Sequence, residues 1–322
     1  MINTPIIECV PNFSEGRRPE VIEAIAASIR QVEGVKLLDV DPGKGTNRTV
    51  MTMAGSPERV IEAAYQAIKT AASLIDMRTH TGEHPRMGAT DVCPLIPISG
   101  ITMEETAKYA HQLAKRVGKE LAIPVYMYES AATKPERRNL ADIRAGEYEG
   151  FAAKMLDTNW QPDYGPHTFN ANAGATVIGA RDFLIAYNVN LNTRSVRKAN
   201  SVAFDIREKG RIKRIGDPVT GEIIRDEQGQ PVREDGMLKG IKAIGWYIEE
   251  YGIAQVSMNI TNIALTSLHK AFDSCMERAT ARGLRVTGSE LVGLVPLQVM
   301  LDAGRHYLRK QELSSAVSDK EL

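Results

Sequence analysis

The chain has 322 residues, of which 43% are hydrophobic and 25% charged, and its 40 basic residues equal its 40 acidic ones. This length can build two domains of ordinary size, each with its own core, and the composition is that of a globular protein. The balanced charge argues against nucleic acid as a partner, no apolar run is long enough to span a membrane, and the first ten residues lack the basic region of a signal peptide.

The first half of the chain alternates between hydrophobic patterns of period 2 and period 3.6, which indicate strands and helices. The expected strands lie at 5–10, 35–40, 48–54, 91–98 and 125–128. The expected helices begin at Pro19, at Ser56 and at Thr102. Ser56 is followed by a proline that suits the first helical turn, and Thr102 forms a capping box with Glu105.

Two stretches of the first half carry turn signals instead. Residues 41–45, Asp-Pro-Gly-Lys-Gly, predict a turn between two strands. Residues 130–180 are rich in Gly, Pro, Asn and Asp, and we interpret them as a connector that also lines the site. Short helices are expected in it near 139–145 and 148–156.

The second half repeats this plan without repeating the sequence. It predicts a strand at 183–191, a helix ending near 208, a hairpin of strands at 240–249 and 254–260, a helix at 267–282, a strand at 284–286 and a closing helix at 295–308. Residues 210–236 are highly charged and contain several glycines, which is typical of a protruding hairpin or a mobile insertion.

Each half therefore has the element order β-α-β-β-α-β, which is the ferredoxin-like order. We predict an α+β fold of two ferredoxin-like subdomains with antiparallel sheets, at residues 1–180 and 181–322. Two such units side by side are expected to leave a substrate cleft between them.

The three cysteines, Cys9, Cys93 and Cys275, lie in apolar-rich segments. They cannot all pair, and they lack the spacing of a metal site. We expect buried thiols in a reducing compartment, with catalysis by Cys93 as a minor alternative, and hence a cytoplasmic location.

Residues 76–93, DMRTHTGEHPRMGATDVC, are the best candidate for the chemistry. His80 and His84 are four residues apart, and imidazole transfers protons near neutral pH without prior tuning. The pattern H-x-x-E-H would suit zinc on a helix, and a zinc hydrolase using both histidines is one alternative. Gly82 and Pro85 argue against that helix. A polar surface loop without function is the other alternative.

Six segments carry a family resemblance, and they follow one another along nearly the whole chain. They are ECVPNFSEG at 8–16, LLDVDPGKGTNRTV at 37–50, GEHPRMGATDVCPLIP at 82–97, IRAGEYEG at 143–150, GWYIEEYGIAQVSMNI at 245–260 and SELVGLVPL at 289–297. Together they resemble the glutamate formimidoyltransferase (formiminotransferase) family of folate-dependent enzymes in histidine breakdown. The resemblance is to the form without a cyclodeaminase domain.

The resemblance implies a reaction and a site. Members transfer a formimino group between N-formimino-L-glutamate and tetrahydrofolate, giving 5-formimidoyltetrahydrofolate and L-glutamate. Tetrahydrofolate is then the co-substrate, no metal is required, and a homodimer is expected. The family's catalytic histidine corresponds to His84. A folate-contacting segment corresponds to Gly165, Pro166, His167, Thr168, Phe169, Asn170, Ala171, Asn172, Ala173 and Gly174.

The chemistry calls for further groups around His84. The imidazole of His84 needs an acceptor that orients it, and a carboxylate on a strand is the natural choice. Asp39 and Asp41 alternate on the second expected strand, in the sequence LDVD, so both point to the same face. The other interpretation of Asp41 is turn chemistry before a Pro-Gly pair. Both substrates carry carboxylates, which guanidinium binds in a bidentate manner. The candidates for binding are Arg48, Arg78, Arg86 and His80, and ordinary surface charge is the alternative for each arginine.

Other functions are compatible with parts of this pattern. One alternative is a related folate enzyme that transfers formyl groups, or an ATP-driven cyclo-ligase, although the sequence has no P-loop. Another is a folate-binding protein without catalysis. Substitution of His84 and direct assay with both donors separate these alternatives from the transferase.

Overall fold

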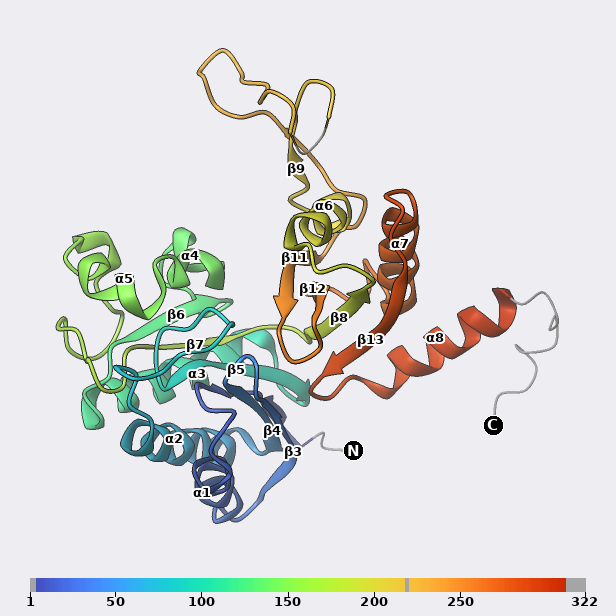
Figure 1. Ribbon diagram of the computed structural model, residues 1–322. Helices are drawn as coiled ribbons and strands as arrows, with labels where there is room; N and C mark the ends of the chain where they lie inside the picture. Colours follow the sequence, from blue (N-terminus) through green and yellow to red (C-terminus); the bar gives the residue numbers. More distant parts are fainter. Residues whose placement is uncertain (1–3, 218–219, 311–322) are drawn as a thin grey trace. The chain divides into compact units, whose positions relative to one another are not determined.

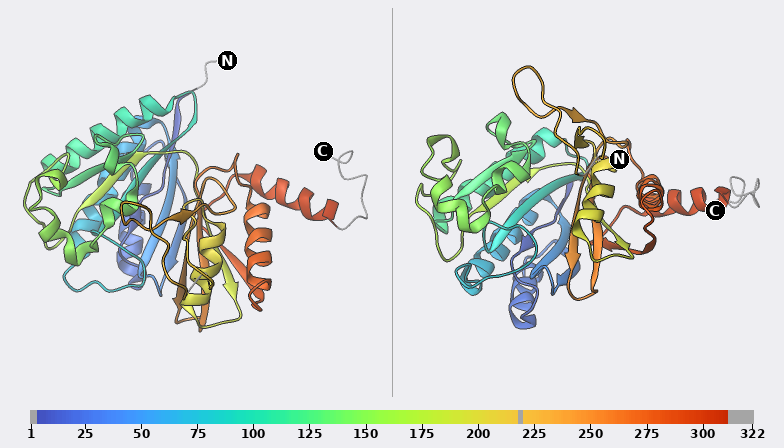
Figure 2. Two further views of the ribbon diagram at one scale, coloured as in Figure 1. Left: turned by 90° about the horizontal axis from the view of Figure 1, so that it is seen from above. Right: turned by 45° about the horizontal axis from the view of Figure 1, so that its top comes forward.

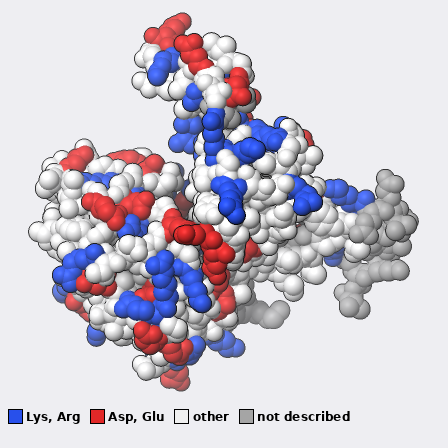
Figure 3. All heavy atoms as spheres, in the orientation of Figure 1, with Lys and Arg blue, Asp and Glu red and all other residues white. Residues whose placement is uncertain are grey.

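The computed structural model describes residues 4–217 and 220–310, and the chain divides between Asp182 and Phe183 into two compact units (Figure 1). We call residues 4–182 the first unit and residues 183–310 the second unit. Each unit contains a β-sheet covered by helices, so the chain has an α+β fold of two units, as predicted. Basic and acidic side chains lie intermixed on the face shown in Figure 3, consistent with their equal numbers.

The first unit is built on one seven-stranded sheet. Its strands are β1 (Ile6–Cys9), β2 (Asn12–Phe13), β3 (Val35–Gly43), β4 (Arg48–Gly55), β5 (Thr90–Ser99), β6 (Val125–Glu129) and β7 (Thr176–Ala180). Its longer helices are α1 (Pro19–Arg30), α2 (Pro57–Leu74) and α3 (Met103–Glu120). Strands β1 and β2 lie between β4 and β5, and β3 continues the sheet beyond β4.

The sheet of this unit is mixed and not purely antiparallel as expected, and residues 130–180, interpreted as a connector that also lines the site, contribute a strand to it. Strand β7 enters between β5 and β6 and runs parallel to both. All five of its residues, TVIGA, are buried. A strand covered on both faces has a continuous apolar run without alternation, so a search for period 2 misses it. The expected short helices are present as α4 (Leu140–Arg144) and α5 (Glu147–Lys154), and they are flanked by 3-10 turns at Pro135–Arg137 and Thr158–Trp160.

The turn expected at 41–45 begins later than predicted. Strand β3 extends through Pro42 and Gly43, which pair with Thr49 and Arg48 of β4. Proline is tolerated there because β3 pairs with β4 alone, so its missing N–H costs the sheet no hydrogen bond on the open side.

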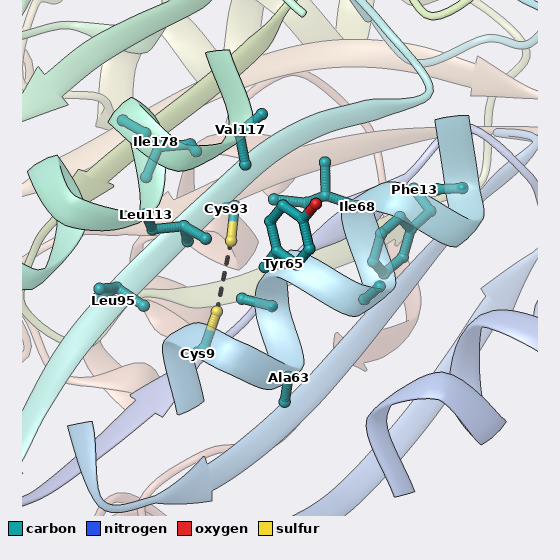
Figure 4. Close-up of a cluster of buried hydrophobic side chains, with 14 of the residues drawn as sticks. Cys9, Phe13, Ala63, Tyr65, Ile68, Cys93, Leu95, Leu113, Val117 and Ile178 are labelled. Atoms are coloured by element: carbon teal, nitrogen blue, oxygen red, sulfur yellow. Dashed lines mark hydrogen bonds between the residues drawn. The ribbon is translucent and has the colours of Figure 1, made fainter. Parts of the chain in front are cut away.

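Helices α1, α2 and α3 pack on one face of the first sheet over a core of aliphatic and sulfur side chains (Figures 2 and 4). Cys9 and Cys93 lie in this core, on β1 and β5, with their sulfur atoms 3.5 Å apart. Burial raises the pKa of Cys9 well above that of a free thiol. Catalysis by Cys93 would therefore start from a thiol that water does not reach.

A smaller core cluster lies on the opposite face of the same sheet. Tyr126 of β6 and Val177 of β7 pack there against Phe151 of α5. Helices α4 and α5 thus cover the β6–β7 end of the sheet from the second side, which brings the chain from 140 to 154 over the edge where the candidate site lies.

The second unit is a four-stranded antiparallel sheet in the order β11-β12-β8-β13. Its elements are β8 (Ile185–Leu191), α6 (Val196–Ile206), β9 (Arg211–Ile212), β10 (Arg233–Glu234), β11 (Ile241–Ile248), β12 (Ile253–Ile260), α7 (Leu268–Thr280), β13 (Val286–Val292) and α8 (Leu297–Lys310). Helices α6 and α7 cover one face. The charged segment after α6 forms a hairpin with the β9–β10 ladder at its base (Figure 1).

The last strand of the second unit differs from its predicted place. Residues 284–286 were expected, but β13 runs from Val286 to Val292 and pairs with β8. Thr287 and Ser289 are exposed on this edge strand, and their polarity hid the strand pattern. The element order β-α-β-β-α-β is present in both units, and the ferredoxin-like assignment stays a prediction. Among the described helices, none combines the length and the apolar character needed to cross a bilayer.

Candidate active site

The candidate site is organised by residues 75–89, the His loop, which joins α2 to β5 and contains no helix. The Asn47 side chain donates to the Thr81 carbonyl at 2.8 Å, which ties the loop to the β3–β4 turn. A Cβ atom on Gly82 would lie 2.3 Å from the Thr46 carbonyl oxygen, so only glycine fits this close approach. The helix that H-x-x-E-H needs for zinc is therefore absent between the two histidines.

His80 has both ring nitrogens engaged. Its Nε2 lies 3.0 Å from the Asn47 carbonyl, which can only accept, so Nε2 carries the proton. Its Nδ1 accepts a hydrogen bond from Arg86 Nε at 3.2 Å. Burial and the nearby Arg86 lower the pKa of His80, in keeping with a neutral ring. A metal ion could bind His80 only by breaking one of these contacts, so we assign His80 to holding the loop.

Arg86 is a buried cross-link of the His loop. It donates to Glu149 at 2.6 and 2.9 Å, to Glu147 at 3.1 Å and to the His80 carbonyl at 3.1 Å. Both glutamates belong to α5, so Arg86 anchors the loop to that helix. A substrate carboxylate would have to compete with these two glutamates for Arg86.

His84 has the opposite tautomer. Its Nδ1 lies 2.7 Å from the Pro85 carbonyl and therefore carries the proton, which leaves the lone pair of the neutral ring on Nε2. The residue is partly exposed, and burial of the ring together with the positive charges of Arg48 and Arg144 lowers its pKa to about 3. His84 is thus a neutral imidazole at physiological pH, and Nε2 is its basic atom.

Next to His84 lies a group that we call the first ionic cluster, formed by Arg48, Asp91 and Arg144. Asp91 is fully buried and accepts from Arg48 Nη1 at 2.6 Å and from Arg144 Nε at 3.2 Å. Arg144 Nη2 also donates to Asp91, and the Met87 backbone N–H donates to it at 3.0 Å. Burial alone would raise the pKa of Asp91, but the two arginines hold it at about 2. One carboxylate faces two guanidinium groups, so the first ionic cluster carries a net positive charge.

The segment 165–174 packs directly on the His loop. The Ala89 and Ala175 backbone N–H groups donate to the Ala173 and Met87 carbonyls, at 2.8 and 3.2 Å. A Cβ atom on Gly174, whose φ is +68°, would lie 2.2 Å from the Met87 oxygen, so this glycine serves the packing of two chain segments.

The polar side chains of that segment divide into two groups. The amide groups of Asn170 and Asn172 donate to the Ala122 and Ala72 carbonyls and thereby hold the segment in place. The polar side chains of His167 and Thr168 make the second group and are exposed, as are Ala171 and Asn172.

The remaining predicted site residues are Asp39 and Asp41 on β3 and Arg78 in the His loop. Asp39 and Asp41 pair with Thr52 and Val50 of β4, so they share the sheet face of Arg48, away from α1–α3. Their role stays a prediction. Arg78 is exposed and pairs with Asp76 at 2.6 Å within the loop itself.

Two residues that sequence reasoning did not assign a role are central to the site. Asp91 is the charged residue in a buried strand start, TDVCPLIP, and a charge inside an apolar run is the signal that marks it. Arg144 belongs to the quoted segment 143–150, but nothing in its local pattern places it against Asp91, 53 residues away. Within the described residues, no group of three His, Cys, Asp or Glu side chains could hold a metal ion.

Residues 6–181 match the N-terminal subdomain of the formiminotransferase domain, and residues 186–322 match the formiminotransferase domain. The chain is 47% identical to formimidoyltransferase-cyclodeaminase of Dictyostelium discoideum over 96% of its own length, which covers 54% of that protein. The chain thus spans about half the length of these curated relatives.

Two further relatives are close to the chain in length. Glutamate formimidoyltransferase of Streptococcus pyogenes serotype M1 is 41% identical over 95% of the chain and 94% of that protein. Glutamate formimidoyltransferase of Thermoplasma acidophilum is 40% identical over 94% of the chain and 92% of that protein.

Proposed function

The chain belongs to the formiminotransferase family, and from this premise we propose that it transfers the formimino group of N-formimino-L-glutamate to tetrahydrofolate, releasing L-glutamate, in histidine degradation. Tetrahydrofolate is then a co-substrate. The proposal is supported by two relatives of this name that the chain covers almost end to end. The homodimer, the cytoplasmic location, the ferredoxin-like assignment and the substrate cleft stay predictions.

The reaction is an addition followed by an elimination at an amidine carbon. The N5 nitrogen of the folate forms a bond to this carbon and must lose its proton, and the bond to the glutamate nitrogen then breaks as that nitrogen gains a proton. One imidazole that accepts the first proton and returns it to the leaving nitrogen serves both steps. Acid–base catalysis of this kind contributes about a hundred- to ten-thousand-fold in rate.

The tautomer of His84 is the observation that carries this mechanism. The Pro85 carbonyl holds the proton on Nδ1, so Nε2 is the atom that accepts a proton from the attacking amine. The lowered pKa keeps Nε2 unprotonated before the substrates arrive. A ring held in one tautomer and one orientation also loses little freedom when two substrates meet beside it.

The segment 165–174 is proposed to contact the folate. Its hydrogen bonds to the His loop support this role, because a ligand resting on the segment would lie next to the loop that carries His84. Since the amide side chains of Asn170 and Asn172 already hold backbone carbonyls, we assign contact with the ligand to the exposed backbone and side chains between His167 and Ala171.

The test is the His84→Ala variant, assayed with formiminoglutamate and tetrahydrofolate. We expect kcat to fall about a hundred- to ten-thousand-fold. His111→Ala is the matched control, because His111 lies within α3 of the same unit and its ring contacts the Tyr164 hydroxyl. Unchanged turnover in His84→Ala would remove the acid–base role. Preference for N-formylglutamate in the same assay would favour the formyl-transferring alternative.

A further inference from the structure

We propose that Arg48 and Arg144, clamped by Asp91, form a subsite that binds a carboxylate of the amino-acid substrate and thereby makes His84 competent to accept a proton only when that substrate is present. This inference rests on the proposed function for the identity of the ligand. The subsite itself is defined by the geometry of the first ionic cluster.

The first ionic cluster has hydrogen-bonding capacity that the protein does not use. Arg48 directs Nε to Asn12 at 3.1 Å and Nη1 to Asp91, and Arg144 directs Nε and Nη2 to Asp91. The other terminal nitrogens, Nη2 of Arg48 and Nη1 of Arg144, donate no hydrogen bond to another described residue. The Arg48 and Arg144 side chains are 8% and 14% exposed, so neither is fully enclosed and bulk water does little to screen their charges.

The charge of the first ionic cluster points to an anion. Asp91 neutralises only one of two nearly buried guanidinium groups, and His84 is neutral. A buried charge without a counter-charge is costly, and a carboxylate is the planar anion that guanidinium groups bind best. The other two candidate arginines are less suitable, because Arg86 already binds Glu147 and Glu149 and Arg78 already binds Asp76.

Binding at the subsite would act directly on His84. The charged groups that influence its ring are Arg48 from β4, Arg144 from α4 and Asp91 from β5. After burial, the two arginines are the largest causes that lower the pKa of His84. A bound carboxylate offsets their charge and makes Nε2 more basic, so the substrate strengthens the base that its own reaction requires.

The experiment measures binding of glutarate, a dicarboxylate without an amino group, by NMR of the imidazole nitrogens. We expect glutarate to raise the pKa of His84. In Arg144→Gln we expect affinity for glutarate to fall, and KM for formiminoglutamate to rise, by about ten- to a hundredfold, the effect of losing a hydrogen bond to a charged group. The KM for tetrahydrofolate is expected to stay within twofold.

Arg138→Gln is the matched control, because Arg138 is an exposed arginine six residues earlier on the same connector. Arg144→Lys, which keeps the charge without the planar fork, guards against a folding defect and is expected to recover part of the affinity. Wild-type affinity for glutarate in Arg144→Gln, an equal loss in Arg138→Gln, or a His84 pKa that glutarate does not move would each overturn the proposal. If glutarate binding depends on Arg144 but the protein has no transferase activity, the proposed function is wrong and the subsite stands.

Discussion

The two units contain ionic clusters of the same composition, one aspartate between two arginines, and only one of them lies beside a candidate base. The first ionic cluster consists of Asp91, Arg48 and Arg144. The second ionic cluster consists of Asp205, Arg211 and Arg282. Both clusters carry one excess positive charge, so charge alone does not distinguish a site from a structural cross-link.

The clusters differ in the partners of their arginines and in the burial of their aspartate. In the second ionic cluster, Arg211 also donates to the Ser201 carbonyl at 2.7 Å, and Arg282 donates to the Ser201 hydroxyl at 2.6 Å and to the Arg278 carbonyl at 3.0 Å. Its aspartate is 16% exposed, whereas Asp91 is fully buried. The second ionic cluster therefore joins α6 to the chain after α7, with all three guanidinium nitrogens of Arg282 engaged and Arg211 bound through Nη2. In the first ionic cluster each arginine keeps one terminal nitrogen that donates to no other described residue.

The largest expected difference between the clusters is in stability. Asp91→Asn leaves two nearly buried guanidinium groups without a counter-charge, so we expect the free energy of unfolding of the first unit to fall by about 3–5 kcal/mol. Asp205→Asn, in the partly exposed cluster, is expected to cost the second unit about 1 kcal/mol.

Chemical denaturation measures both effects, because each unit has one tryptophan, Trp160 in the first and Trp246 in the second. Fluorescence of single-tryptophan variants follows each unit separately. Equal losses for the two substitutions would mean that burial of the aspartate does not separate the clusters.

A second difference concerns substrate binding. Arg144→Gln should raise KM for formiminoglutamate by about ten- to a hundredfold, whereas Arg282→Gln should leave it within twofold, because Arg282 spends its donors on backbone and serine oxygens. Steady-state kinetics with varied formiminoglutamate and saturating tetrahydrofolate test this contrast. A comparable rise in KM for Arg282→Gln would show that the effect comes from general loosening of the chain.

The sequence predicted the parts of this contrast that local patterns encode. Helix α2 starts at Pro57 and helix α3 starts behind its Thr102–Glu105 capping box, as expected from the N-terminal signals. The His loop was also recognised as a segment that Gly82 and Pro85 keep from being helical. Each of these properties depends on neighbours within a few residues, so a local pattern is sufficient to reveal it.

The missing parts depend on contacts between distant segments. The parallel pairing of β7 brings residues 174–175 beside Met87, and α4 then carries Arg144 to Asp91. Neither contact produces a periodic pattern of hydrophobic residues in the sequence. The sequence pattern predicts that Asp39 or Asp41, which alternate on the second expected strand, is the carboxylate that orients His84. The structure adds Asp91, which binds Arg48 and Arg144 from distant segments of the chain beside the ring.

The smallest expected effect is the pH dependence that the first ionic cluster gives to the first unit. The pKa of His84 is about 3 in the folded protein and about 6.5 in the unfolded chain. Below pH 6.5 the unfolded chain therefore takes up a proton that the folded state refuses, and stability falls as the pH is lowered from 6.5 towards 3. One group can contribute about 1.4 kcal/mol per pH unit, so the loss between pH 6.5 and 5 should be about 1–2 kcal/mol.

Denaturation of the first unit at these two pH values, followed at Trp160, measures that loss. His84→Gln should remove it and His111→Gln should keep it, while unfolding of the second unit followed at Trp246 should be unaffected by His84→Gln. Saturating glutarate should shrink the loss in the wild-type protein but not in Arg144→Gln, because an occupied subsite lets the folded state accept the proton more readily. If His84→Gln loses as much stability as the wild type, the imidazole is not held neutral by its neighbours, and the two ionic clusters differ only in burial.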